Sequence, residues 1–298
     1  MNYTLVEKIE DFRKLLEDFK KNGTKTLSMD FEEESNLHVY GEHLCTIQLF
    51  DRQKYYLIDA LALQKTDEGR ALLKEFLEGE EEKIMFDCSS DAAIVRKVLA
   101  IHMANVYDLR IVAKTLGFDG NLTSLIERNL HIPSEGVASK HRFQRANWMR
   151  RPLPEAQIQY ALADVQYLFD LKASLEAELE TKSPGVRTQV RSQMKKCAQP
   201  KHKDRPGWEK ICNYKRLSLR EKVFIKYFFI ARDEIARKKN VPPANILDKR
   251  LIVKMAEKED WKEIVPEGFK YARAFEKAKE EALEHLSEIS EAQTRQKH

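Results

Sequence analysis

Residues 26–32 read Thr-Leu-Ser-Met-Asp-Phe-Glu, and the alternation of apolar and polar side chains in this stretch predicts a β-strand. Asp30 and Glu32 lie two positions apart, so both carboxylates point to the same face of the strand. Aspartate is uncommon inside strands, and an unpaired buried charge is strongly destabilising. Two carboxylates at this position therefore favour a bound cation. The structural alternative is a strand whose polar face contacts solvent.

The sequence that follows predicts short strands and then alternating helices and strands. Residues 44–50 and 55–60 are apolar strands, and the polar residues 51–54 between them are typical of a hairpin turn. The next segment has helical spacing, and the apolar runs 84–86 and 105–107 predict two later strands. This order predicts an α/β fold in which a mixed sheet is flanked by helices.

A third candidate acid follows the run at residues 84–86. Asp91 comes after Ser89 and Ser90, which are typical of a helix N-cap, and an acid in the first turn is stabilised by the helix dipole. Asp87 is an equally placed alternative, because periodicity does not choose between the two acids. An acid that serves only to cap the helix is the structural alternative.

Tyr160 and Asp164 form the last pair of candidate residues. They stand four positions apart in a helix predicted at residues 154–177, so their side chains stack on one side of it. The apolar stripe of this helix is formed by other residues: Ile158, Ala161, Leu162, Val165 and Phe169. Tyr160 and Asp164 therefore belong to a polar face, either at a functional site or as an ordinary surface pair.

The bulk composition indicates a globular protein of about two domains. Of the 298 residues, 42% are hydrophobic and 34% are charged, which permits a sizeable core. No apolar run approaches the ~18 residues of a membrane span, and the N-terminal residues lack the basic start of a secretion signal. The four cysteines are scattered without a Cys-x-x-Cys pair. We therefore expect reduced thiols, no membrane association and a cytoplasmic location.

Charge is unevenly distributed along the chain, although the formal net charge is only +4. Residues 1–100 are acidic, whereas residues 182–220 contain twelve Lys/Arg against two acids. Basic segments beside an acidic centre suggest a polyanionic partner, and a solvated linker explains them equally well. The composition predicts four parts: a domain over 1–180, a basic linker over 181–205, a helical domain over 206–285 and a polar tail over 286–298.

These motifs resemble those of the DEDDy group of 3′→5′ exonucleases, and most of all those of ribonuclease D. The first family motif, Asp-x-Glu followed by a Leu-x-x-Ile-Gln strand, is matched by Asp30, Glu32 and residues 44–49. The third motif is the most specific, and its matching positions are Lys140, Gln144, Trp148, Arg151, Pro152, Leu153, Gln157, Tyr160 and Asp164. The resemblance covers about residues 1–180 and implies an RNase H-like mixed sheet flanked by helices.

The second family motif is matched with one departure. Lys83 begins the strand, Phe86 replaces the usual His, and Asp91 rather than Asp87 aligns with the family's acid. A weaker resemblance over about residues 205–285 relates the C-terminal part to the HRDC domain, a small all-α module that often follows this exonuclease. It rests on Trp208, Phe229, Arg232, Ala236, residues 240–243, Ile246 and Leu251.

The resemblance implies a site for two Mg²⁺ or Mn²⁺ ions held by four acids: Asp30, Glu32, Asp91 and Asp164. Such ions prefer oxygen ligands. Asp30 is expected to bridge both ions, Glu32 and Asp164 to hold the ion beside the attacking water, and Asp91 to support the other ion. Tyr160 is expected to orient the water, because a phenol with a pKa near 10 is a poor base.

The resemblance also implies a nucleic-acid partner, RNA with a free 3′ end in the first place. The predicted contacts are Lys140, Arg142, Gln144, Arg145, Trp148 and Arg151. A core position is the commoner alternative for a tryptophan like Trp148. The expected reaction is the hydrolysis of RNA 3′ ends, such as those of transfer-RNA precursors, to nucleoside 5′-monophosphates. A DNA exonuclease and a catalytically silent nucleic-acid-binding scaffold are the alternatives, and protein partners are not indicated.

Overall fold

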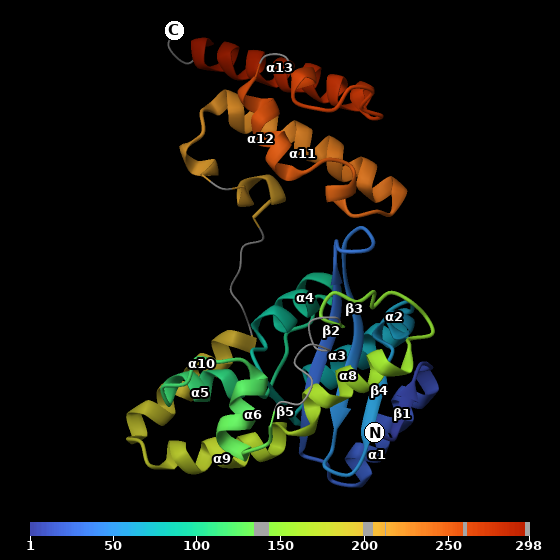
Figure 1. The fold of residues 1–298 in the computed structure, drawn as a ribbon, viewed down its shortest axis with the longest axis vertical. Helices are drawn as coiled ribbons and strands as arrows, with labels where there is room; N and C mark the ends of the chain where they lie inside the picture. The colour runs from blue at the N-terminus through green and yellow to red at the C-terminus, as the bar shows by residue number, and fades with distance from the viewer. Residues whose placement is uncertain (134–142, 199–204, 212, 259–260, 296–298) are drawn as a thin grey trace. The chain divides into compact units, whose positions relative to one another are not determined.

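The computed structural model describes residues 1–133, 143–198, 205–211, 213–258 and 261–295. The chain divides into two units (Figure 1). The first comprises Met1–Glu34 and Glu42–Lys201, and the second Ser35–Gly41 and His202–His298. The first unit is a mixed sheet flanked by helices, which confirms the predicted fold class. The described C-terminal part is helical, as expected for a small all-α module.

The first unit is built on a six-stranded sheet with the order β1-β4-β3-β2-β5-β6. Its strands are β1 (Tyr3–Val6), β2 (Thr26–Ser35), β3 (Glu42–Phe50), β4 (Tyr55–Ile58), β5 (Glu82–Met85) and β6 (Val106–Asp108). β1 runs parallel to β4, β5 runs parallel to both β2 and β6, and β3 runs antiparallel to β4. The strands that the apolar patterns predict are all present, whereas the edge strand β1 has no clear sequence pattern.

The helices of the first unit are α1 (Ile9–Lys21), α2 (Ala60–Leu63), α3 (Asp67–Leu77), α4 (Ser89–Leu99), α5 (Leu109–Thr115), α6 (Leu122–Leu130), α8 (Glu155–Gln166), α9 (Leu168–Glu180) and α10 (Pro184–Ala198). The helix predicted at residues 154–177 is in fact two helices, α8 and α9. Tyr167 separates them with φ −104° and ψ 4°, outside the α-helical region.

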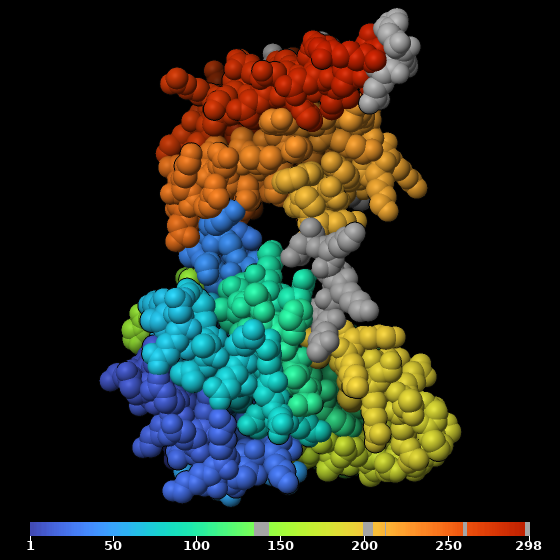
Figure 2. Space-filling model, turned by 180° about the vertical axis from the view of Figure 1, so that it is seen from behind, coloured from blue at the N-terminus to red at the C-terminus, as the bar shows by residue number. Residues whose placement is uncertain are grey.

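Helices cover both faces of the sheet, and this arrangement decides where the acids of β2 point. Helices α1, α3 and α4 pack against one face, where Leu27, Met29 and Phe31 of β2 enter the main core; Figure 2 shows this side of the unit, in blue through cyan to green. Helix α8 crosses the other face and packs on β3 and β4 (Figure 1). Successive side chains of a strand alternate between faces, so Asp30 and Glu32 lie on the side of α8.

Helix α10 occupies most of the segment that the sequence predicts as a basic linker. Its residues Val190, Met194 and Ala198 are buried in the cores of the first unit. The structure therefore differs from the predicted linker over residues 181–205. The segment carries an apolar residue at every fourth position of its buried side, while its many basic residues occupy the other sides of the helix.

The second unit is formed by helices around a separate aromatic core. Its elements are α11 (Leu219–Lys239), α12 (Lys249–Glu257), α13 (Ala272–Arg295) and the 3₁₀ turns η1 (Gly207–Lys210), η2 (Tyr214–Arg216), η3 (Pro243–Asn245) and η4 (Trp261–Glu263). Phe228, Trp261 and Phe275 form the centre of its core. Helix α13 continues to Arg295, so most of the predicted tail over 286–298 is helical. Within the described ranges, no helix is long and apolar enough to cross a membrane.

Candidate metal centre

Three of the predicted acids lie together on the α8 side of the sheet. Asp30 and Glu32 come from β2, and Asp164 comes from α8. Each offers a carboxylate oxygen, and these oxygens all lie within 4.8 Å of one another. At this spacing one cation can contact all three groups. The three side chains are partly exposed, so that an ion and a substrate can reach them.

Burial and mutual repulsion raise the pKa values of these acids. Burial is the largest cause at Asp30, followed by the charge of Asp164, and together they hold the pKa of Asp30 well above its ordinary value. Burial also comes first for the raised pKa of Glu32, followed by the charges of Asp30, Asp164 and Asp91. Carboxylates that oppose one another's ionisation are stabilised in the charged form by a cation. The donor set therefore fits divalent cations that prefer oxygen ligands.

Asp91 belongs to the same electrostatic group, whereas Asp87 has a different partner. Asp91 is 9% exposed in the first turn of α4. Burial, followed by the charge of Asp30, holds the pKa of Asp91 well above its ordinary value. Asp87 has a left-handed backbone with φ 64° and forms an ion pair with Arg110. Of the two acids that periodicity leaves open, Asp91 is thus the one coupled to Asp30 and Glu32.

Asp108, at the end of β6, positions the first turn of α4. Its carboxylate accepts the backbone N–H groups of Asp87 at 3.0 Å and of Cys88 at 2.9 Å. Cys88 is the N-cap residue and its side chain makes no cap hydrogen bond, so the N-cap predicted at residues 89–90 is wrong by one to two positions. Asp108, on a neighbouring strand, thus holds the two residues that lead into α4 and thereby fixes the turn that carries Asp91.

Tyr160 lies one helical turn before Asp164, and its ring packs with two other aromatic rings. The ring centroid is 5.3 Å from that of Phe143 and 6.4 Å from that of Trp148. Burial raises the pKa of Tyr160, followed by the charges of Asp164 and Glu32, and a hydrogen bond from the hydroxyl to Asp164 adds to the shift. The phenol therefore stays protonated near neutral pH, where it acts as a hydrogen-bonding group rather than as a base.

The predicted nucleic-acid contacts fall into different environments. Lys140 and Arg142 lie outside the described residues. Gln144 and Arg145 are exposed, as a contact to RNA requires. Trp148 is only 2% exposed and packs in a small core beneath α8, which agrees with the alternative that it is a core residue.

The guanidinium group of Arg151 is used inside the fold. Nε and Nη2 donate to the two carboxylate oxygens of Asp59 at 2.5 and 2.9 Å. Further hydrogen bonds reach the backbone oxygens of Trp148 at 2.7 Å and Cys45 at 3.0 Å. The structure therefore differs from the prediction of a phosphate contact. This bidentate pair instead ties the segment that enters α8 to the start of α2, and so helps to position α8.

Glu33 is an acid beside the cluster, and no sequence motif marks it. Its Oε1 atom is buried without a hydrogen-bond partner among the described residues. Burial, followed by the charge of Glu42, raises the pKa of Glu33 to about 7. The charge of Glu33 in turn contributes to the raised pKa values of Asp30 and Asp91. The run of glutamates at residues 32–34 signals acidity, but it carries no signal for this burial.

Two positions of the second motif lie outside the acid cluster. Lys83 is fully buried, its Nζ donates to the backbone oxygen of Gly79 at 2.8 Å, and burial lowers its pKa to about 8. Phe86, which stands where the resemblance implies a His in many members, packs against the hydrophobic cluster that α5, α6, α9 and α10 share. The aromatic ring at this position is therefore part of the apolar packing.

Comparison with known proteins identifies the family of the chain. The family model described as 3′-5′ exonuclease matches residues 3–180, more than half of the sequence. The chain therefore belongs to this family of DEDD 3′-5′ exonucleases, as its acidic motifs predict.

Individual relatives agree with this membership. Ribonuclease D of Nitrobacter hamburgensis is 29% identical over 218 residues, which cover 70% of this chain and 53% of that protein. The solved RRP6 catalytic core of Trypanosoma brucei has a TM-score of 0.74 at 16% identity and covers 95% of this chain and 80% of its own. Escherichia coli RNase D has a TM-score of 0.71 at 23% identity, with coverages of 94% and 76%. These two structures share the fold. The chain spans about half or less of the length of the first relatives that it matches.

Proposed function

We propose that the chain is a ribonuclease D-like 3′-5′ exoribonuclease that hydrolyses the terminal phosphodiester of RNA and releases nucleoside 5′-monophosphates. The observation that carries the proposal is the convergence of Asp30, Glu32 and Asp164, with Asp91 coupled to them. Membership of the 3′-5′ exonuclease family supports it. E. coli RNase D, which shares the fold, is an exoribonuclease involved in structured RNA processing. RNA with a free 3′ end, such as a transfer-RNA precursor, is the substrate that we propose.

The four acids would hold two divalent cations, Mg²⁺ or Mn²⁺. When bound, such cations lower the pKa of the attacking water and stabilise negative charge at the leaving oxygen. We assign Asp30 as the shared ligand, because its carboxylate interacts electrostatically with both Asp164 and Asp91. The acids must lose their protons before they can serve as ligands, so that their raised pKa values set protons and cations in competition.

Tyr160 would hold the attacking water in place. Its hydroxyl group donates its proton to Asp164 and keeps it, so the phenol oxygen can accept a hydrogen bond from the water without removing a proton from it. The rings of Phe143 and Trp148 pack against the phenol and restrict its orientation. A fixed hydrogen-bonding group at this position holds the water in a reactive orientation.

The wider contact with RNA is proposed to come from basic residues outside the acid cluster. Gln144 and Arg145 are the exposed candidates, Lys140 and Arg142 belong to the same segment, and Arg151 is left out because its donors are used internally. We propose that the helical unit is an HRDC-like module that extends this contact. A cytoplasmic location completes the proposal, since the four cysteines carry no paired Cys-x-x-Cys pattern.

The test is an exonuclease assay with purified full-length chain. A 5′-labelled single-stranded RNA and a DNA of the same sequence are incubated in Mn²⁺, in Mg²⁺ and in EDTA. We expect a ladder of RNA shortened from its 3′ end in metal, none in EDTA, and nucleoside 5′-monophosphates as products. If the DNA is shortened as fast as the RNA or faster, the chain is a DNA exonuclease and the proposed RNA substrate is wrong. Binding without shortening in either metal would contradict hydrolysis and identify a silent scaffold.

A further inference from the structure

Two cysteines from distant segments meet inside the first unit. The Sγ atoms of Cys88, at the start of α4, and of Cys197, in the last turn of α10, lie 3.1 Å apart although 109 positions separate them in the sequence. Both residues are free thiols. Cys88 is fully buried, and Cys197 is partly exposed and thus accessible from solvent. This pair is not part of the acid cluster or of the proposed reaction.

The hydrogen bonds around the pair allow the two thiols to lose their protons. Cys197 donates its thiol proton to Oδ2 of Asp108 at 3.3 Å, so the Cys88 thiol can donate to the sulfur of Cys197. Asp108 already accepts three backbone N–H groups, those of Asp87, Cys88 and Arg110. Loss of the Cys197 proton therefore leaves no buried oxygen without a donor.

The ligand atoms of Cys88, Asp108 and Cys197 lie within 4.8 Å of one another, and the hydrogen bonds of Asp108 favour a disulfide over a metal site. Two thiolates on one tetrahedral zinc ion, each at about 2.3 Å from the metal, stand about 3.8 Å apart. The sulfurs of Cys88 and Cys197 are closer than that, at 3.1 Å. The carboxylate of Asp108, which a metal would need as a third ligand, is already engaged with backbone amides. A disulfide, with an S–S bond of about 2.05 Å, requires the sulfurs to approach by about 1 Å, and it needs no third ligand.

We propose that Cys88 and Cys197 form a reversible disulfide that ties α10 to the start of α4. The oxidant is a small disulfide such as oxidised glutathione. The Cys197 thiolate attacks it, forms a mixed disulfide and releases one reduced glutathione. Cys88 then loses its proton and attacks the Cys197 sulfur, and a second glutathione leaves as the thiol. Two protein thiols are oxidised and one small disulfide is reduced, so the exchange is balanced and runs backward in a reducing compartment.

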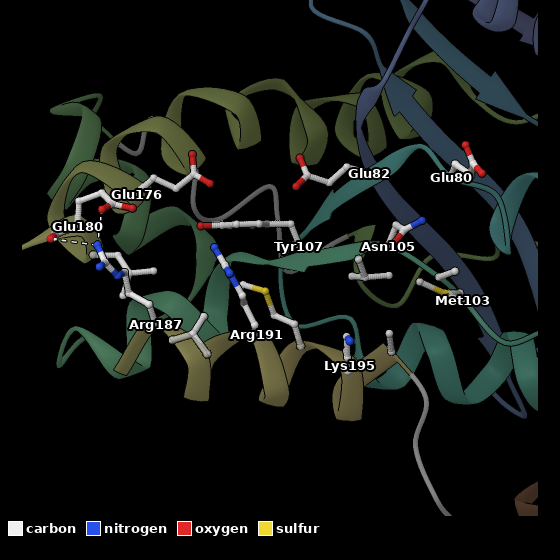
Figure 3. Close-up of a pocket in the computed structure, with 16 residues that line it drawn as sticks. Glu80, Glu82, Met103, Asn105, Tyr107, Glu176, Glu180, Arg187, Arg191 and Lys195 are labelled. Atoms are coloured by element: carbon white, nitrogen blue, oxygen red, sulfur yellow. Dashed lines mark hydrogen bonds and ion pairs between the residues drawn. The ribbon is translucent and has the colours of Figure 1, made fainter. Parts of the chain in front are cut away.

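The bond would fix the C-terminal end of a helix that also forms one wall of a cleft. Arg187, Arg191 and Lys195 of α10 line this cleft of about 740 Å³, with Tyr107 and Glu176 among the residues on its other sides (Figure 3). Cys197 lies two residues beyond Lys195, at the end of the helix where the described part of the first unit stops. Oxidation would thus hold this wall against the sheet.

The experiment measures thiols and stability of the full-length chain at defined ratios of oxidised to reduced glutathione. Thiol exchange is stopped with acid, and the remaining thiols are alkylated. The masses of the intact protein and of its digested peptides are then measured by mass spectrometry. We expect the number of alkylated thiols to fall from four to two, and one cross-linked peptide pair to contain Cys88 and Cys197. The oxidised protein should unfold at a temperature roughly 5–10 °C higher, since the bond closes a long loop in the unfolded chain. Reduction should reverse both changes.

Three serine variants make the result decisive. Cys197→Ser and Cys88→Ser should lose the cross-link and the stabilisation, and Cys197→Ser alone suffices if the buried Cys88→Ser does not fold. Cys45→Ser is the matched control, because the Cys45 sulfur lies 3.7 Å from a methionine sulfur, and it should keep both effects. Four free thiols under full oxidation, a cross-link between other cysteines, or glutathione retained on Cys197 would each overturn the proposal. So would stoichiometric zinc in the reduced protein that Cys197→Ser fails to bind.

Discussion

The carboxylate of Asp30 is electrostatically linked to most of the other acids described above. Asp164 and Glu33 raise its pKa, and its own charge raises the pKa values of Glu32 and Asp91. Without cations, the neighbouring carboxylates repel one another. With cations bound, the same carboxylates attract the ions and so contribute to the free energy of cation binding. A change at Asp30 should therefore affect activity and metal-free stability in opposite directions.

Asp30→Asn should abolish hydrolysis while the fold and RNA binding remain. Loss of a shared ligand removes several kcal/mol of transition-state stabilisation, which corresponds to about a hundredfold or more in rate. The rate of RNA shortening in Mn²⁺ measures this effect. Asp87→Asn is the matched control, because Asp87 lies near α4 but pairs with Arg110, and it should keep most of the activity. An Asp30→Asn protein with more than about five per cent of the activity would contradict the metal site.

Tyr160→Phe should slow the reaction less than the loss of an acid. The ring keeps its packing against Phe143 and Trp148, and only the hydroxyl group beside Asp164 is lost. A misplaced water costs about a tenfold to hundredfold reduction in kcat, with KM for RNA nearly unchanged. Steady-state kinetics with a short RNA separate the two constants. A rise in KM alone would show that Tyr160 binds substrate rather than positioning water.

The raised pKa values predict how pH acts on the protein without cations. An acid whose pKa is higher in the folded than in the unfolded state stabilises the fold below the unfolded pKa, near 4, and this stability is lost as pH rises through the folded value. For Glu33 that folded value is about 7, and Asp30, Glu32 and Asp91 shift in the same direction. The unfolding temperature in EDTA should therefore fall between about pH 5 and pH 8. Mn²⁺ should stabilise the protein more at the higher pH.

Glu33→Gln provides the control for this pH dependence. This variant removes one carboxyl group whose pKa is raised, and it leaves all the proposed metal ligands in place. The unfolding temperature should therefore fall less between about pH 5 and pH 8. An unfolding temperature in EDTA that rises over the same pH range would show that the acids are compensated within the fold.

At the scale of elements, β2 and α8 could be predicted because their patterns are local. The alternation along residues 26–32 sets the face of Asp30 and Glu32, and the four-residue spacing of Tyr160 and Asp164 sets their common side of α8. Neither inference needs a contact between distant segments. The two elements that carry most of the proposed site were therefore accessible from the sequence.

The remaining features depend on contacts between distant segments, which local patterns do not contain. Asp87 and Asp91 differ in their distant partners, because Asp87 pairs with Arg110 at a separation of 23 positions. Arg151 likewise pairs with Asp59 at a separation of 92 positions. Helix α10 is different, because Val190, Met194 and Ala198 do form a helical stripe. The many Lys and Arg residues of this segment are typical of a linker, whereas the spacing of its apolar residues is typical of a helix. The apolar spacing therefore predicts α10 and the composition does not.

Met194→Ala tests whether α10 is part of the exonuclease unit. The Met194 side chain is 7% exposed within the hydrophobic cluster that contains Val112 and Leu175. Its truncation should lower the free energy of unfolding of this unit by about 2–4 kcal/mol. Urea denaturation, with hydrogen exchange of β6 and α5 as a local probe, measures the change. Gln189→Ala, on an exposed side of the same helix, should change the stability by less than about 0.5 kcal/mol. Equal changes in the free energy of unfolding for the two variants would show that α10 does not pack in the core and is a linker.

At the scale of the whole molecule, the two units have separate hydrophobic cores. The clusters of the first unit end at Ala198, and the cluster of the second unit begins at Trp208. A chain of residues 1–201 should therefore fold and keep metal-dependent hydrolysis. If the helical unit contributes to RNA binding through its basic residues, the shortened chain should bind RNA more weakly and with a smaller dependence on salt. Circular dichroism tests whether the shortened chain folds, and the RNA assay tests whether it hydrolyses RNA. Binding measured at two salt concentrations tests the weaker contact with RNA. An unfolded 1–201 chain would show that the units depend on each other.

The distance in sequence between β2 and α8 also affects the newly made protein. The ribosome adds about 5–20 residues per second, so roughly 7–27 s pass between the synthesis of Asp30 and that of Asp164. During this interval the nascent chain carries Asp30 and Glu32 without the third acid of the cluster. Residues 165–298 are still to be added when Asp164 has been made, so the acid cluster can assemble on the ribosome before the helical unit is complete.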